Sequence, residues 1–274
     1  MKKFLYLILG SLVFIFIVLL YSRFIGTTSL KVHEFVIKTN IQESYDGLKI
    51  VHFTDLHYKK IITEDRVKKL IKEINKTKPD LILFTGDLLD DLYRMTNTDT
   101  NFLIKELSKL EAKYGKYAIL GDQDYSQKEI VTNIYIQSDI KLLNNTYTTI
   151  YNNDDKIILA GLGSYLKDDF NIDNIAIPDT SPYVMFLVHE PDMIDKIKER
   201  YSSTSLIIAG HSINGSVNIP GIKQVLLPEG ATKYYDTYYK IDNTNIYISN
   251  GIGVNNLNFR LFNKPSFNLY RLKN

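Results

Sequence analysis

Short apolar runs that alternate with amphipathic helical patterns are the feature that most limits how this chain can fold. Residues 48–53 and 81–84 are apolar runs of strand length. Between them Val67, Leu70 and Ile74 recur at the spacing of one helix face, which predicts a helix that connects two buried strands.

The rest of the chain continues this alternation and then loses it. A second helical pattern at 103–110 leads into a strand-length run at 117–120. From about residue 221 no helical period remains, and the chain ends in alternating segments at 259–261 and 267–269 that we expect to be strands. Strands alternating with helices, followed by strands alone, predict a mixed α/β sandwich. The three remaining strand-length runs are 157–160, 184–188 and 206–209.

An uncharged apolar run from residue 4 to residue 21 precedes this part. At about 1.5 Å per residue it reaches the minimum length that crosses a ~30 Å hydrocarbon core. Lys2 and Lys3 precede the run, as in a signal peptide, but no small-residue cleavage site follows, which favours an uncleaved anchor. The positive-inside rule would keep both lysines in the cytoplasm and the domain outside the cell membrane, although Arg23 opposes this orientation. We expect a single-pass anchor over 1–25, a linker and leading strand over 26–46, and one domain over 47–274.

The charge balance and the absence of cysteine restrict the chemistry. The chain has 33 basic and 31 acidic residues, a balance that argues against nucleic acid as a partner. Without cysteine, any metal must be held by oxygen and imidazole. Of the five histidines, His33 and His52 are predicted to be structural, and Asp90 and Asp124 to brace their loops.

Acidic and imidazole side chains follow the predicted strands. The segments D-L-H at 55–57, G-D-L-L-D at 86–90 and G-D-Q-D at 121–124 each come after one, as do His189 and His211. Because ligands bind at the carboxyl ends of strands in open α/β folds, these groups are expected to converge. Imidazole with carboxylate suits Mn, Fe or Zn, and two such ions about 3.5–4 Å apart would clamp a phosphate.

In this order the motifs resemble those of the calcineurin-like metallophosphoesterases: D-x-H, G-D-x-x-D, G-N-H-[DE], a lone His and G-H-x-H. The chain is most similar to their membrane-anchored bacterial branch and to phosphoesterases that cleave lipid-linked nucleotide sugars, and 248–253 and 259–265 resemble that branch's closing segment. The resemblance covers residues 47–272 and implies a sandwich of two mixed sheets flanked by helices. It implies Asp55, His57 and Asp87 as ligands of a first metal, and Asp87, Asp122, His189 and His211 as ligands of a second.

Three positions depart from the family pattern. Asp122 replaces an asparagine, which adds a negative charge and favours a hard cation. Gln123 replaces the histidine that assists the leaving group; it can orient a phosphate but delivers no proton, a loss that typically costs roughly 10²- to 10⁴-fold. Ile213 replaces the second histidine of G-H-x-H, so the first metal loses a ligand, and Asn214 could reach the site only if the loop shifts.

The leading prediction is a membrane-anchored hydrolase of phosphoric esters or pyrophosphates with one or two Mn, Fe or Zn ions per chain. A metal-activated hydroxide held near Asp87 would attack phosphorus in line, on a phosphorylated and lipid-linked substrate. The alternative, suggested by Gln123 and Ile213, is a catalytically weakened or silent relative that binds metal and a phosphorylated ligand. A membrane-tethered interaction domain without metal is a third and less favoured hypothesis.

Overall fold

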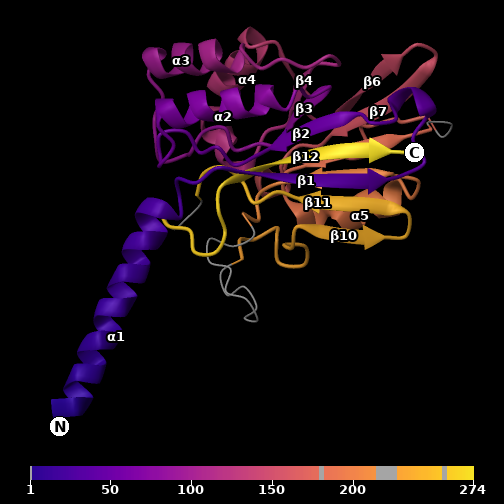
Figure 1. The fold of residues 1–274 in the computed structure, drawn as a ribbon. Coiled ribbons are helices and arrows are strands. Elements are labelled where there is room, and N and C mark those ends of the chain that lie inside the picture. Colours follow the sequence, from indigo (N-terminus) through magenta and orange to yellow (C-terminus); the bar gives the residue numbers. More distant parts are fainter. Residues whose placement is uncertain (1, 179–181, 214–226, 255–257) are drawn as a thin grey trace.

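The computed structural model describes residues 2–178, 182–213, 227–254 and 258–274, and its main body is a pair of six-stranded sheets (Figure 1). The first sheet has the strand order β1-β12-β2-β3-β4-β5, and the second has the order β10-β11-β9-β8-β7-β6. The first contains β1 (Lys31–Lys38), β2 (Lys49–Phe53), β3 (Leu81–Phe84), β4 (Lys116–Ala118), β5 (Ile140–Leu142) and β12 (Ser266–Lys273). The second contains β6 (Thr146–Asn152), β7 (Asp155–Gly161), β8 (Val184–Val188), β9 (Leu206–Ala209), β10 (Tyr238–Ile241) and β11 (Thr244–Ile248).

Both sheets are mixed, as expected. Strands β2 to β5 are parallel, and β12 runs antiparallel to β2. In the second sheet β7, β8, β9 and β11 are parallel, with the antiparallel strands β6 and β10 at the edges. In Figure 1 the arrows of β12 and β10 point away from α1 (Lys2–Leu20), so the antiparallel strands β2 and β11 end on the side where α1 joins the domain. The carboxyl ends of the central strands of both sheets therefore lie at this end of the molecule.

The two sheets pack face to face and carry helices on their outer faces. Leu81 and Leu83 of β3 contact the layer between the sheets, whereas Ile82 and Phe84 pack under the helices of the first sheet. Strands buried on both faces read as continuous apolar runs, which is why the sequence reveals them so clearly. The first sheet is covered by α2 (Glu64–Lys76), α3 (Asn97–Leu107) and α4 (Lys128–Gln137), and the second by α5 (Ile194–Arg200). Short 3-10 turns are η2 (Glu43–Tyr45), η3 (Asp122–Gln127), η4 (Tyr165–Lys167) and η5 (Pro191–Met193).

Helix α1 leaves the domain as a single rod and continues into a π-helical turn, η1 (Tyr21–Ile25) (Figure 1). None of its residues is buried, and residues 2–25 are long and apolar enough to cross a membrane by length and composition. The end of this helix contacts the domain, because Ser22 O accepts a hydrogen bond from the Arg260 main-chain N–H at 3.1 Å.

Most of the predicted elements are present, and one is wrong. The runs 184–188 and 206–209 coincide with β8 and β9, and 267–269 lies within β12. The segment around 259–261 belongs to no strand of either sheet. Its central residue, Arg260, bonds to turns and to the end of α1 through both main chain and side chain, so the segment forms no ladder.

Candidate metal centre

The loops after five central strands bring the predicted site residues together at the α1 end of the sandwich. Strands β2, β3 and β4 supply the acidic residues and one histidine, and β8 and β9 supply the other two histidines. In chain order the loops carry Asp55, His57, Asp87, Asp122, His189 and His211.

The backbone of these loops is strained where the polar side chains begin. The φ angles are 52° at Asp55, 44° at His57, 57° at Asp87 and 64° at His211. Each lies in the left-handed region, which costs a residue other than glycine on the order of 1–3 kcal/mol and persists where surrounding contacts enforce it. Such strain commonly marks functional sites.

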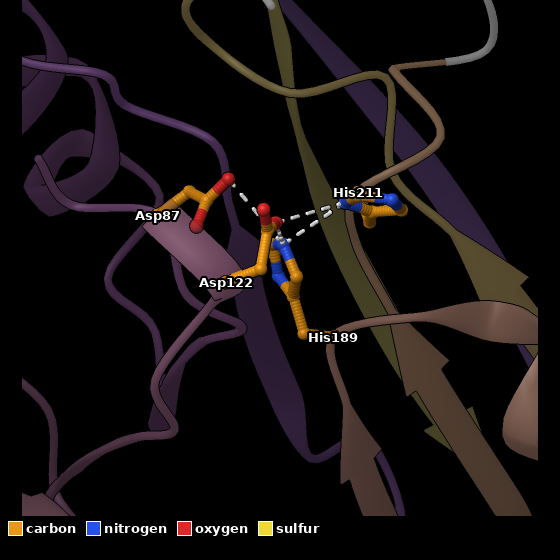
Figure 2. Close-up of side chains that lie close together, drawn as sticks. All are labelled: Asp87, Asp122, His189 and His211. Carbon is orange, nitrogen blue, oxygen red and sulfur yellow. Dashed lines mark hydrogen bonds and ion pairs between the residues drawn. The ribbon is translucent and has the colours of Figure 1, made fainter. Parts of the chain in front are cut away.

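The larger cluster consists of Asp87, Asp122, His189 and His211, and all four side chains are buried (Figure 2). The Nε2 atom of His189 lies 3.4 Å from Asp87 Oδ2 and 3.3 Å from Asp122 Oδ1. The Nδ1 atom of His211 lies 3.3 Å from the same Asp122 oxygen and 3.2 Å from His189 Nε2. Four ligand-type atoms therefore point at one small volume.

The outer nitrogen of each of these histidines is held by a backbone carbonyl. His189 Nδ1 lies 2.6 Å from Thr85 O, and His211 Nε2 lies 2.7 Å from Glu229 O. A carbonyl oxygen only accepts hydrogen bonds, so each outer nitrogen carries the hydrogen, and the inner nitrogens of neutral rings direct lone pairs at each other. Converging lone pairs and carboxylate oxygens repel one another unless a proton or a cation lies between them.

The smaller cluster consists of Asp55, His57 and Asp87, which are also buried. His57 Nε2 lies 3.8 Å from Asp55 Oδ1 and 3.6 Å from Asp87 Oδ2. Its other nitrogen, Nδ1, lies 3.5 Å from Asp90 Oδ2, which forms an ion pair with Lys60 Nζ at 2.7 Å. The distance from the outer nitrogen of His57 to its partner is therefore longer than the corresponding distances for His189 and His211.

Four buried atoms at the junction of the two clusters lack a hydrogen-bond partner among the described residues. An unpaired buried polar atom costs about 1–3 kcal/mol or more, so several in one place require an explanation. Oxygen and imidazole nitrogen are donors that suit Mn, Fe and Zn, and Asp87 Oδ2 faces both clusters. The residues present therefore fit a pair of divalent ions that share Asp87. The four atoms are Asp55 Oδ1, His57 Nε2, Asp87 Oδ2 and Asp122 Oδ1.

The ionisation of the cluster leads to the same interpretation. Burial disfavours the charged form of His189, but the carboxylates of Asp87 and Asp122 outweigh it and raise the pKa of His189 well above 6.5. The pKa values of His57 and His211 are also raised by adjacent carboxylates against the effect of burial. The raised pKa values favour protonated imidazoles when no cation is bound, whereas metal binding requires neutral imidazoles and so releases protons.

Gln123 and Asp124 support the cluster from the loop that contains them. The Gln123 side-chain amide donates to Asp122 Oδ2 at 2.6 Å, and its main-chain N–H donates to Asp87 Oδ1 at 2.9 Å. The Asp124 carboxylate accepts main-chain N–H bonds from Asp87 at 2.9 Å and Gly121 at 3.0 Å, which confirms its bracing role. Burial and the charge of Asp87 raise the pKa of Asp124 to about 7.

The smaller cluster has three ligand-type residues where the larger one has four, and Ile213 stands where the family pattern has a further histidine. Its side chain is buried and apolar, and its carbonyl accepts a hydrogen bond from Asn263 Nδ2. Asn214, the substitute that the sequence suggested, lies outside the described residues. The two halves of the site are therefore unequal in the number of ligand-type residues that they present.

The two remaining histidines take the structural positions expected of them. His52 Nε2 lies 2.8 Å from Thr85 Oγ1, and its Nδ1 lies 3.2 Å from the hydroxyl of Tyr270. His33 lies on β1, with its ring edge-on to Phe35. Neither belongs to the two clusters.

A comparison with protein families identifies the family to which the chain belongs. The model of the calcineurin-like phosphoesterases matches residues 48–242. The chain belongs to the calcineurin-like phosphoesterase family.

Three relatives illustrate the range of this family. The Bacillus subtilis protein described as an uncharacterized metallophosphoesterase, YkuE, is 30% identical over 92% of this chain and 89% of its own length. An uncharacterized metallophosphoesterase of Aquifex aeolicus is 25% identical over 90% of this chain and 93% of its own length. A Danio rerio protein named a transmembrane protein with metallophosphoesterase domain is 20% identical over 85% of this chain, which spans only 55% of that relative.

Membership in the calcineurin-like family agrees with the chemistry of the two clusters, because these phosphoesterases use divalent metals and the clusters can bind them. Residue types alone do not predict the outer partners, namely the carbonyls of Thr85 and Glu229 and Lys60 beside Asp90, nor the buried contacts of Arg260. Backbone carbonyls leave no signal in residue types, and the alternating pattern around Arg260 predicts a strand. A lone arginine within the closing segment was the one available sign.

Proposed function

We propose that this calcineurin-like chain is a membrane-anchored, metal-dependent hydrolase of phosphoric esters or pyrophosphates. The observation that carries the proposal is that imidazole nitrogens of both clusters approach the buried, unpartnered Asp87 Oδ2, with His57 Nε2 at 3.6 Å and His189 Nε2 at 3.4 Å. A carboxylate between two ligand sets is the arrangement that a two-metal phosphoesterase requires.

The residues that would hold the two ions differ in number. Mn, Fe or Zn would suit these donors, and such ions supply Lewis acidity that lowers the pKa of a water and offsets charge on a phosphoryl group. The first set would be Asp55, His57 and Asp87, and the second Asp87, Asp122, His189 and His211.

Within this proposal, Asp87 and Gln123 position the reacting groups. The Gln123 main-chain N–H fixes Asp87 Oδ1, which leaves Oδ2 free for the site. The Gln123 amide donates to Asp122 and carries no titratable proton, so it offers the leaving group hydrogen bonds alone. We expect the chain to favour substrates whose leaving group departs unprotonated, such as aryl esters and pyrophosphates.

The position of the anchor supports a lipid-linked substrate. Helix α1 joins the domain at the end where the site loops lie (Figure 1), and Ser22 bonds to Arg260 there. The same end carries exposed apolar side chains, Phe24 at 62%, Ile25 at 52% and Phe262 at 69% exposure. A substrate whose phosphate lies at the membrane surface would meet the site without leaving the bilayer.

We further propose that the domain lies on the outer side of the cell membrane, because Lys2 and Lys3 precede the apolar helix. The absence of cysteine allows a clean test, since an exposed single-cysteine variant, Ser203→Cys, has no background. Labelling of this variant in intact cells by a membrane-impermeant maleimide supports the orientation. Labelling only after lysis contradicts it.

Hydrolysis tests the proposed activity directly. The full chain, purified in detergent and supplied with Mn²⁺, should hydrolyse an aryl phosphodiester or an aryl phosphate. Asp87→Asn should lower the rate by at least about 10²-fold, because the shared carboxylate is lost and the reacting groups are misplaced. Asp91→Asn, a change at an exposed neighbouring acid, is the matched control and should leave the rate unchanged.

A silent relative that binds metal and a phosphorylated ligand is the second candidate. It is favoured by two observations: the Gln123 amide is occupied by Asp122, and Ile213 presents an apolar side chain. Under this candidate the natural chain would bind Mn²⁺ without turnover, and only the double variant Gln123→His, Ile213→His would gain activity. Turnover by the natural chain, lost in Asp87→Asn, decides for the hydrolase.

A further inference from the structure

Arg260 is a fully buried arginine whose side chain donates to main-chain carbonyls in the described part of the chain. Its Nε donates to Gly253 O at 2.8 Å, its Nη1 to Asn250 O at 2.8 Å, and its Nη2 to both Gly251 O and Gly253 O. The energetic cost of burying an unpaired guanidinium is several kcal/mol, so the position needs a reason. Burial lowers the pKa of Arg260 to about 9, which leaves it charged at neutral pH.

The turn that Arg260 holds lies directly against Asp55. Gly253 N donates to Asp55 O at 2.6 Å, and Ile252 N donates to Thr54 O at 3.0 Å. Gly251 has a φ of +68°, and a Cβ placed there would lie 3.0 Å from Asp55 Cβ. The turn at 250–253 therefore contacts both the strained backbone and the side chain of Asp55.

The other hydrogen bonds of Asp55 involve its amide, which donates to Gly86 O at 3.0 Å, and one carboxylate oxygen. One carboxylate oxygen, Oδ2, accepts the main-chain N–H of His211 at 3.1 Å, and the other, Oδ1, has no hydrogen-bond partner in the described chain. The direction of Oδ1 thus depends on the bond to Oδ2 and on the backbone that the 250–253 turn holds. A backbone φ of 52° at Asp55 would relax if this support were removed.

The main chain of Arg260 connects the same turn to the end of the membrane helix. Its N–H donates to Ser22 O at 3.1 Å, and a Cβ on Gly26 would lie 2.1 Å from its carbonyl oxygen. Only glycine allows this close approach. One residue therefore contacts both the anchor and the turn that supports a candidate metal ligand.

We propose that Arg260 is a positioning residue that orients Asp55 through the 250–253 turn and thereby sets the metal affinity of the Asp55 half of the site. The inference rests on the proposed metal-dependent function. Arg260 lies outside both clusters and would affect only the Asp55 half. The histidines of the other half, His189 and His211, are fixed by the carbonyls of Thr85 and Glu229.

The test is a Mn²⁺ titration of the metal-free full chain in detergent, followed by calorimetry, with the thermal unfolding of the metal-free protein measured in parallel. Arg260→Lys keeps the charge but cannot reach three carbonyls, so we expect the weaker Mn²⁺ step to lose roughly 10- to 100-fold in affinity. The tighter step should stay unchanged, whereas the unfolding temperature should fall, because buried carbonyls lose a donor. Arg271→Lys, at an exposed arginine paired with Glu34 on the same part of the chain, is the control and should bind as the natural chain does.

A second variant guards against misfolding. Arg260→Ala leaves a buried space of guanidinium shape, and millimolar methylguanidinium should restore the weaker Mn²⁺ step. Unchanged Mn²⁺ binding in Arg260→Lys overturns the inference, as does equal weakening of both steps or a failure of rescue. A natural chain that binds no Mn²⁺ overturns the proposed function itself, so the two failures are distinguishable.

Discussion

The two halves of the candidate site share Asp87 but are built differently. On the Asp122 side, each histidine has its outer nitrogen within 2.7 Å of a backbone carbonyl. On the Asp55 side, the outer nitrogen of His57 lies 3.5 Å from Asp90, and three residues rather than four present ligand atoms. The number of ligands and their support from outside the site both favour the Asp122 half.

A shared carboxylate therefore does not make the two positions equivalent. Preorganised ligands hold a cation without paying for rearrangement, and their outer hydrogen bonds typically contribute about 10- to 100-fold in affinity. We therefore expect one tightly held ion on the Asp122 side and one weakly held ion on the Asp55 side. The losses at Gln123 and Ile213 then have different consequences, the first for catalysis and the second for metal affinity.

The largest effect should come from removing one histidine on each side. His189→Gln takes a ligand from the tight position and should weaken the first Mn²⁺ step by more than the roughly 100-fold that an outer partner contributes. His57→Gln should abolish the second step and leave the first intact. Calorimetric titration of both variants distinguishes the halves, and a loss of the same step in both would break the comparison.

An added ligand at position 213 should reduce the difference in Mn²⁺ affinity between the two halves. Ile213→His adds an imidazole to the weak half and should raise the affinity of the second Mn²⁺ step by at least about tenfold, which is the value of an outer partner. Ile213→Val, a change of similar size without a ligand, is the control. If the histidine variant binds Mn²⁺ no better than the valine variant, residue 213 does not belong to the weak position.

The outer carboxylate of the weak half offers a smaller test. Asp90 faces His57 Nδ1 and is paired with Lys60, so Asp90→Asn should lower the affinity of the second step by about tenfold. The first step should not change. If Asp90→Asn weakens the first Mn²⁺ step instead, Asp90 supports the Asp122 half and the assignment is wrong.

The smallest expected effect is on stability against pH in the metal-free chain. Burial opposes protonation, but the neighbouring carboxylates raise the pKa of His189 well above, and that of His57 above, the ordinary 6.5. A histidine whose pKa is raised in the folded state adds to the free energy of unfolding. This contribution is largest below about pH 6.5 and is lost as the pH rises through the folded-state pKa.

The unfolding temperature of the metal-free chain should therefore fall as the pH rises above about 6.5, by about 2–4 °C for each kcal/mol lost. The pKa of Asp122 is depressed by its histidine partners despite burial, so that carboxylate stays ionised and adds no slope in this window. With Mn²⁺ bound the trend should reverse, because the metal requires neutral imidazoles. A rise in the metal-free unfolding temperature with pH contradicts the assignment.

The parts of the fold that the sequence predicted well are those in which one physical effect dominates. Strands β8 and β9 are buried on both faces, so their residues form uninterrupted apolar runs with the bounds that the structure has. Helix α2 buries Val67, Leu70 and Ile74 on a single face. Helix α4 was not predicted, because its buried residues, Val131, Ile134 and Tyr135, are β-branched or aromatic and suit a strand as well.

The sequence predicts which side chains form the candidate site but not how the main chain orients them. The order of acids and histidines predicted which residues would meet, and the structure brings Asp55, His57 and Asp87 together. The sequence does not predict which nitrogen of a histidine faces inward, since that depends on carbonyls such as Thr85 O. Arg260 was missed for the same reason, because its partners are main-chain oxygens.

The most direct test of the unequal two-metal site is anomalous scattering from Mn²⁺ in crystals of the full chain, grown once with one equivalent and once with an excess. We predict a single peak among Asp122, His189 and His211 at one equivalent, and a second peak beside Asp55 and His57 in excess, with Asp87 next to both. A first peak on the Asp55 side, equal occupancy of both positions at one equivalent, or no peak at all would contradict the account.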